Sequence, residues 1–354
     1  MGAQAGRPSG VSPSPPVTVA FDALGAEAGP TVVVEGVTAA ASTGIGVRVF
    51  GDPEKLSGLR SVSGVEVIAS TELIGNDEEP VRAVRSRPGA SIVMAAADVA
   101  AGGSDALASP GSTGATMTAA LFALKRIRSV QRPALAVEIP APGRERPLLM
   151  LDVGANADAR PSHLVQFAYL GSAFAGAVLG LDEPRVGLLS VGTEAKKGSS
   201  VVVEAHETLA SSAGIRFAGN VEGRELLDPD VEVLVTDGFT GNVVLKTIEG
   251  TAKSVAEAVR SAARSGPRAA AGGLLLRPAL GGLREDMDPD GTGGAILLGL
   301  RGVAVVGHGS SGALGVANQI KLAARAVSER AVERTEELIE ASGVGRAAIR
   351  DGES

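Results

Sequence analysis

The sequence predicts an α/β fold in which helices cover a largely parallel sheet. Short runs of β-forming residues alternate with helical patterns along most of the chain, as in folds built from strand–helix–strand units. Several of these runs are continuously apolar, which is typical of strands buried on both faces. A chain of 354 residues, 44% hydrophobic and 21% charged, is long enough for a sizeable core.

The predicted strands run from VTVAF near the N-terminus to VAVVG near the C-terminus. They are residues 17–21, 47–50, 65–69, 105–109, 134–139, 148–153, 185–191, 231–235 and 303–307. Helical periodicity fills most of the intervals and predicts, among others, helices at residues 115–127, 161–175 and 315–341. This alternation indicates one α/β domain over residues 17–345, with no internal repeat.

The two ends of the chain are expected to be tails. Residues 1–16 are rich in Gly, Ser and Pro, which predicts disorder, and residues 346–354 form a short C-terminal tail. The first residues lack the apolar core of a secretory signal, and no apolar run approaches the ~20 residues that span a bilayer. We therefore expect a cytoplasmic protein.

Composition excludes several classes of function. A net charge of −7 and an aromatic content of 2% argue against nucleic acid as a partner. The chain has no cysteine, so disulfides, thiolate metal sites and a cysteine nucleophile are excluded. With only three histidines a multi-histidine metal site is not expected, and no metal or cofactor is predicted.

Small, polar, glycine-rich segments follow six of the predicted strands. They are Asp22–Glu27, Ser109–Ala115, Asp152–Asn156, Val191–Gly198, Thr236–Asn242 and Gly307–Gly312. In a parallel sheet the carboxyl ends of the strands lie at one edge, where open α/β sheets bind ligands. The sequence therefore predicts that all six segments converge on one site.

Two of these segments have the features of anion cradles. GHGSSG, residues 307–312, fits G-x-G-x-x-G, but no strand follows its helix, so nucleotide binding is rejected. SPGSTGA places Ser109, Ser112 and Thr113 before a helix, where hydroxyls and free amides suit a phosphate. Capping of that helix explains one hydroxyl but not all three.

The remaining segments supply charged and amide groups, each with a structural alternative. Lys197 can neutralise an anion, although loop lysines are usually solvated. Asn242 can donate an N–H to an oxyanion or cap a helix, and Asp237 can be a turn residue. His308 lies between glycines, so its ring is expected to face an open site. Residues alone therefore predict an anion site with a few polar donors.

A basic, leucine-containing segment interrupts this acidic protein at about residues 253–284. It carries six Lys or Arg residues against one acid, Glu257, and includes AAAGGLLLRPALGGL. Such a segment suits an anionic membrane or an acidic partner. The alternative is an ordinary helix pair with a solvated basic face.

Several long segments, taken in order, resemble the phosphate acyltransferase family, which converts acyl-acyl carrier protein and phosphate into acyl phosphate for phospholipid synthesis. They are LDVGANADARPSHLVQFAYLGSAFA, RVGLLSVGTEAKKG, FAGNVEGRELL, TDGFTGNVVLKTIEG and GGAILLGLRGVAVVGHGSS. The resemblance spans about residues 17–330. It implies a three-layer α/β/α sandwich similar to isocitrate and isopropylmalate dehydrogenases and to phosphate acetyltransferases, without their cofactors.

The resemblance also implies partners and residue roles. It implies a homodimer at the membrane periphery, acyl carrier protein and inorganic phosphate as substrates, and a downstream glycerol-3-phosphate acyltransferase. Lys197, Asn242 and His308 would be catalytic. Phosphate or substrate would contact Asp22, Ser109, Ser112, Thr113, Asn156, Glu194, Asp237 and Thr240. Membrane or carrier protein would contact a helical protrusion through Arg264, Arg268, Leu274, Leu275, Leu276 and Arg277.

The chain departs from the family pattern at Leu24, Ala26 and Glu27, at Pro110 and Ser112, and at Gly312, where the family has Asp. These departures leave two alternatives beside the acyl-carrier-protein enzyme. One is a phosphate acyltransferase that uses acyl-coenzyme A, and the other is a catalytically silent scaffold that recruits enzymes of lipid synthesis to the membrane.

Overall fold

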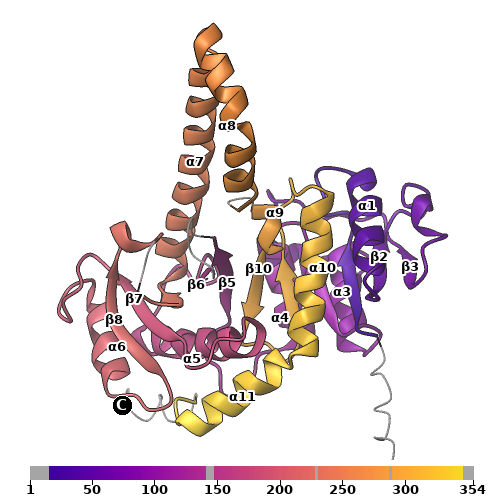
Figure 1. Cartoon of the computed structure of the whole chain (residues 1–354). Coiled ribbons are helices and arrows are strands. Elements are labelled where there is room, and N and C mark those ends of the chain that lie inside the picture. The colour runs from indigo at the N-terminus through magenta and orange to yellow at the C-terminus, as the bar shows by residue number, and fades with distance from the viewer. Residues whose placement is uncertain (1–15, 141–146, 228–229, 287–288, 346–354) are drawn as a thin grey trace, which may run out of the picture.

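A single mixed sheet runs through the protein in a computed structural model that describes residues 16–140, 147–227, 230–286 and 289–345 (Figure 1). Its 11 strands lie in the order β3-β2-β1-β4-β11-β10-β5-β6-β9-β7-β8. Their bounds are β1 Thr18–Asp22, β2 Gly46–Gly51, β3 Val65–Ala69, β4 Ala106–Ser109, β5 Ala134–Ile139, β6 Leu148–Leu151, β7 Arg185–Ser190, β8 Arg216–Glu222, β9 Val233–Val235, β10 Ala295–Leu298 and β11 Val303–Val306.

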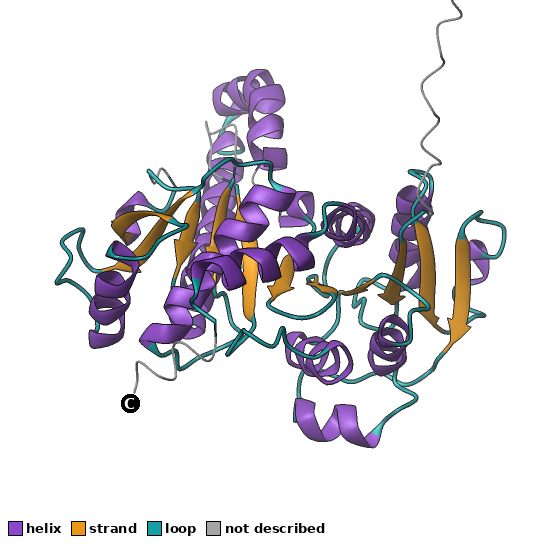
Figure 2. Cartoon of the chain, turned by 90° about the horizontal axis from the view of Figure 1, so that it is seen from below, coloured by secondary structure: helices purple, strands orange, loops and turns teal. Residues whose placement is uncertain are grey.

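Helices cover both faces of this sheet, as Figure 2 shows. One face packs against α1 Pro30–Ala41, α5 Pro161–Val178, α6 Ser200–Ala210, α10 Ala313–Ser328 and α11 Ala331–Ser342. The other packs against α2 Pro80–Ser86, α3 Ser91–Ala100, α4 Thr113–Leu124 and the base of α7 Gly238–Ala263. The predicted three-layer α/β/α sandwich is confirmed.

Strand direction changes within the sheet, and this decides where the loops lie. β1, β2, β3, β4 and β11 are mutually parallel, but β10 is antiparallel to both β11 and β5. β6 in turn is antiparallel to β5, and β9, β7 and β8 follow the direction of β6. The carboxyl ends of β1, β4 and β11 therefore lie at one edge of the sheet, and those of β6, β9 and β7 lie at the opposite edge.

Two strands and one helix break were absent from the sequence prediction. β8 and β10 were not predicted, because RFAGNVE and AILL are too short or too glycine-interrupted to stand out. The single helix expected at residues 315–341 is two helices, α10 and α11, separated at Arg330, whose φ is 55°. The predicted tails at residues 1–16 and 346–354 lie outside the described residues, apart from Pro16.

A helical hairpin of α7 and α8, Pro267–Asp286, projects from the body of the molecule (Figure 1). Its two helices approach closely at Gly273, where a Cβ would lie 2.8 Å from the Cβ of Ala263. The basic, leucine-containing segment predicted at residues 253–284 forms the outer half of α7 and most of α8. No helix among the described residues has the length and apolar character to cross a membrane.

Candidate active site

Three loops lie side by side at the edge where β6, β9 and β7 end, since β9 pairs with both of its neighbours. These loops and the start of α7 carry six predicted site residues, here called the Asn242 group: Asn156, Glu194, Lys197, Asp237, Thr240 and Asn242. Some of these side chains are bound by the protein itself, and others face solvent. Their hydrogen bonds separate the two kinds.

Asp152, which the sequence analysis did not single out, holds the first of these loops. Its buried carboxylate accepts hydrogen bonds from the backbone N–H groups of Leu135 (3.1 Å), Gly154 (3.2 Å), Ala155 (2.8 Å) and Asn156 (2.8 Å). Burial raises the pKa of Asp152, and these N–H donors oppose that effect. The Asn156 amide donates to Asp152 and to the Pro133 carbonyl, both at 2.8 Å, so it braces the loop.

The first turn of α7 packs directly on this loop. Asp237 is the N-cap: its carboxylate accepts hydrogen bonds from the Thr240 N–H (2.8 Å) and hydroxyl (2.7 Å). A Cβ at Gly238 would lie 2.7 Å from backbone atoms of Asn156, and a Cβ at Gly241 would overlap the Asp152 carbonyl oxygen. The two glycines are thus required by close backbone approach, and Asp237 and Thr240 serve the helix start.

Lys197, Asn242 and Glu194 are the exposed members of the Asn242 group. Asn242 lies near the same loop, since a Cβ at Gly154 would be 3.9 Å from its Oδ1. In the loop after β7, the Glu194 carbonyl accepts hydrogen bonds from the Lys197 N–H and from the Asn220 side chain, both at 2.9 Å. The exposed ammonium and amide can therefore meet a ligand at this edge, while the loops behind them are fixed.

The Asn220 side chain, a second residue that the sequence analysis missed, is held in turn by His206, whose Nδ1 lies 2.9 Å from its Oδ1. His206 also makes an edge-on ring contact with Phe217, at 5.0 Å between centroids. These contacts give His206 a structural role in holding the Asn220 side chain.

At the opposite edge lies a second set, here called the Asp22 group: Asp22, Ser109, Ser112, Thr113 and His308. The Asp22 carboxylate accepts hydrogen bonds from the hydroxyls of Ser91 (2.5 Å) and Ser109 (2.8 Å), and all three residues are buried. Burial raises the pKa of Asp22, although these hydroxyls oppose the shift. Within one chain the polar atoms of Asp22 and Ser109 thus bond each other, and their contact with phosphate stays a prediction.

The other members of the Asp22 group are nearer the surface. Ser112 is the N-cap of α4, with its hydroxyl 3.5 Å from the Ala115 N–H, and Thr113 is exposed. His308 is exposed and its Nδ1 lies 2.8 Å from the Ser310 hydroxyl. Its open position between glycines is as predicted.

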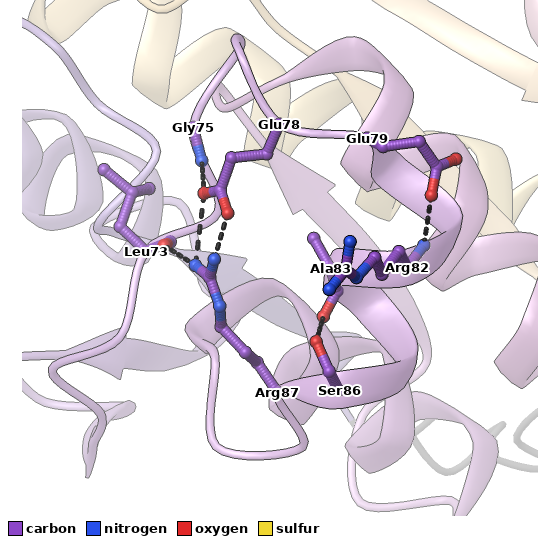
Figure 3. A network of polar contacts seen from close by, with 8 residues as sticks. All are labelled: Leu73, Gly75, Glu78, Glu79, Arg82, Ala83, Ser86 and Arg87. Carbon is purple, nitrogen blue, oxygen red and sulfur yellow. Dashed lines mark hydrogen bonds and ion pairs between the residues drawn. The ribbon is translucent and has the colours of Figure 1, made fainter.

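A segment before α3, residues 73–87, packs on the start of α4 and is held by the polar network in Figure 3. The Arg87 guanidinium forms an ion pair with Glu78 and donates to the Leu73 carbonyl (2.9 Å), and Arg87 lowers the pKa of Glu78. The segment reaches the site through Pro80, whose ring would be 2.7 Å from a Cβ at Gly114. The network thus fixes the cover over the start of α4.

The prediction that six loops converge on one site is wrong for a single copy of the chain. The Asn242 group and the Asp22 group lie at opposite edges, because the sheet reverses direction at β10 and again between β5 and β6. Within the described residues no group of three or more His, Cys, Asp or Glu could hold a metal ion. One copy of the chain therefore has two separate polar surfaces, one formed by each group.

The predicted membrane or carrier-protein residues lie on the hairpin. Arg264 is the C-cap of α7, and it and Arg268 are exposed near the tip. Leu274, Leu275 and Leu276 of α8 are 68%, 83% and 58% exposed. The side chain of Arg277 lies outside the described part of the structure.

Known proteins share both sequence and fold with this chain. Residues 17–334 match the family model described as "Fatty acid synthesis protein". A phosphate acyltransferase of Bacillus licheniformis is 42% identical over 325 residues, which cover 91% of this chain and 98% of that protein. The chain belongs to the phosphate acyltransferase family. A family member from Nostoc punctiforme is 39% identical and covers 90% of this chain and 95% of its own.

Solved structures with low sequence identity show the same fold. The phosphotransacetylase EutD from Staphylococcus aureus is 18% identical with a TM-score of 0.54, covering 88% of this chain and 94% of its own. A branched-chain phosphotransacylase from Enterococcus faecalis V583 is 14% identical with a TM-score of 0.56, covering 88% and 99%. The acyltransferase prediction is thus confirmed at the level of the family, and the fold is shared with phosphotransacetylases.

Proposed function

We propose that this chain transfers a fatty acyl group from acyl-acyl carrier protein to inorganic phosphate, and that the acyl phosphate serves phosphatidic acid and phospholipid synthesis. Family membership supports phosphate as the acceptor, and the description of the family model supports a fatty acyl group. We assign the reaction to the edge where β6, β9 and β7 end, because Lys197 and Asn242 are exposed there above a loop that hydrogen bonds hold in place.

The proposed reaction is a direct displacement. A phosphate oxygen attacks the thioester carbonyl, the C–O bond forms, the C–S bond breaks, and the thiolate leaves and takes up a proton. Lys197 balances the charge of phosphate and Asn242 donates an N–H to the developing oxyanion. Lys197 acts from a hydrogen-bonded loop and Asn242 from the start of α7, which limits the reorganisation needed during the reaction.

We also propose a homodimer in which a second copy supplies the Asp22 group to the Asn242 group. His308 is the exposed titratable side chain of the Asp22 group and would orient phosphate or protonate the leaving thiolate. Because the two groups lie at opposite edges of one sheet, a reaction that uses both needs two copies. A symmetric dimer would then hold two equivalent sites.

The hairpin is proposed to contact an anionic membrane, which would place the product near a glycerol-3-phosphate acyltransferase. Exposed Leu274, Leu275 and Leu276 supply apolar surface, and Arg264 and Arg268 supply positive charge. Serine at all three leucines should weaken sedimentation with phosphatidylglycerol vesicles and leave turnover largely intact. Equal sedimentation of the triple variant would refute membrane contact through these residues.

The deciding experiment measures thiol release from palmitoyl-acyl carrier protein with and without phosphate. The chain has no cysteine, so every new thiol comes from the substrate. Release that depends on phosphate, with a product trapped by hydroxylamine, would support the proposal. Release only from palmitoyl-coenzyme A would transfer the function to the coenzyme A donor, and no release from either would favour the silent scaffold.

A further inference from the structure

The loop that carries His308 is held at its far end by a carboxylate from another part of the chain. Asp290 belongs to α9, Pro289–Thr292, which comes after the hairpin helix α8. Its Oδ2 accepts a hydrogen bond of 2.8 Å from the N–H of Gly312, the N-cap residue of α10. The GHGSSG segment, predicted as a possible anion cradle, thus already bonds an internal anion at its last glycine.

Asp290 occupies the space that a side chain at the start of α10 would fill. A Cβ at Gly315 would overlap the Asp290 carboxylate, and a Cβ at Gly312 would lie 3.3 Å from Oδ2. In a capping box, a side chain at the third helical position bonds the N-cap N–H. Gly315 holds that position without a side chain, and Asp290 makes the equivalent bond from outside the helix.

Further contacts fix α9 and the loop relative to α10. The Asn318 amide donates to the Asp290 carbonyl at 2.9 Å, which docks α9 on α10. The buried Gln319 side chain fills the space beside Gly307, and its Nε2 lies 3.4 Å from the Ser311 hydroxyl. The loop 307–312 is therefore packed from below by Gln319 and tied at its end by Asp290, with His308 exposed between them.

We propose that Asp290 is a positioning residue for the reaction. Its carboxylate bonds the start of α10 and so holds the loop that carries His308. The segment that follows the hairpin therefore fixes the position of that loop. This inference rests on the proposed function in assigning His308 to phosphate.

The position of the carboxylate suggests a double-mutant cycle. Asp290→Ala removes the carboxylate of α9, Gly312→Asp adds a carboxylate at the N-cap of α10, and the double variant has only the added one. Gly312→Asp alone would place two carboxylates close together, and their repulsion should destabilise the loop 307–312. In the Asp290→Ala background the same substitution should stabilise the loop, so its effect changes sign. Glu337→Ala, an exposed acid on α11, controls for loss of charge.

Two measurements on the full chain test the proposal. Losing an N-terminal cap typically changes the local equilibrium about five-fold, so hydrogen exchange across residues 307–315 should accelerate by about that factor in Asp290→Ala. The KM for phosphate should rise about five-fold with the KM for the acyl donor unchanged, a split that simple loss of folded protein does not produce. Both effects should revert in part in the double variant, because a carboxylate at the N-cap bonds the N–H groups of residues 314 and 315 and does not replace the bond to the N–H of residue 312.

Unchanged exchange in Asp290→Ala, or harm from Gly312→Asp in both backgrounds, would overturn the proposal. Faster exchange that reverts in the double variant, with no change in the KM for phosphate, would also overturn the positioning role. The exchange measurement needs no turnover. An unmodified chain that releases no thiol would therefore refute the proposed function, and the exchange cycle would still decide whether Asp290 holds the loop.

Discussion

Lys197 and Asn242 present an exposed ammonium and an exposed amide at the edge that Asp152 and Asp237 brace. Replacing either by Ala should lower the rate of thiol release by ~10²-fold, the scale of losing one preorganised donor to an oxyanion. Lys196→Ala is the matched control, since it removes an exposed lysine from the same loop. Rates within a few-fold of the unmodified chain in both variants would refute the proposed roles.

Asp22 tests a different property, the dependence of stability on pH. Burial raises its pKa above the ordinary value of 3.8, so the folded state binds a proton that the unfolded state has already lost. The contribution to stability is fully present below pH 3.8 and is lost as pH rises through the folded pKa. Asp22→Asn removes this titration, so its stability relative to the unmodified chain should increase from pH 4 upwards. Urea unfolding at several pH values measures the difference, and parallel curves would contradict the prediction.

The residues that could be predicted from sequence are those whose chemistry is visible in one segment. Lys197 lies in a short polar loop after an apolar strand and Asn242 near the start of the helix after another, and these positions suggested donors. Asp152, Ser91 and Asp290 were missed because their partners are distant in sequence or belong to the backbone. The Ser91 hydroxyl bonds Asp22 across 69 positions, and the Asp290 carboxylate bonds Gly312 across 22. No local pattern encodes such pairs.

At the scale of elements, the junction of β9 with α7 depends on Gly241. A Cβ there would overlap the Asp152 carbonyl oxygen, which is backbone and cannot move without displacing the loop. Gly241→Ala should therefore lower the free energy of unfolding by about 2 kcal/mol or more. Gly250, in the same helix with nothing within 4 Å of an added Cβ, is the matched control. Ala there should stabilise by up to about 1 kcal/mol.

Denaturant unfolding of the two glycine variants gives the comparison directly. Equal effects at positions 241 and 250 would mean that α7 does not depend on its contact with the loop 152–156. The element-scale prediction from sequence was good where strands were continuous and valine-rich. It was incomplete at β8, where Gly219 has a φ of 100°, and at β10, where only four apolar residues lie between glycines.

At the scale of the whole molecule, the sheet's reversal could not be predicted from the sequence elements. A parallel and a mixed sheet contain the same strands, and the difference arises from β10, β5 and β6, which pair antiparallel. The sequence therefore predicted the layers correctly and the grouping of the loops wrongly. The physical consequence is that each copy has the Asn242 group at one edge and the Asp22 group at the other.

This separation makes subunit complementation the sharpest test of the proposed dimer. In a hybrid dimer of one Lys197→Ala copy and one His308→Ala copy, one composite site keeps both residues and the other loses both. Hybrids isolated with two different affinity tags should therefore recover about half of the unmodified rate of thiol release, although each single variant is impaired. A hybrid no more active than its parents would show that each copy works with its own residues, and the shared site would have to be abandoned.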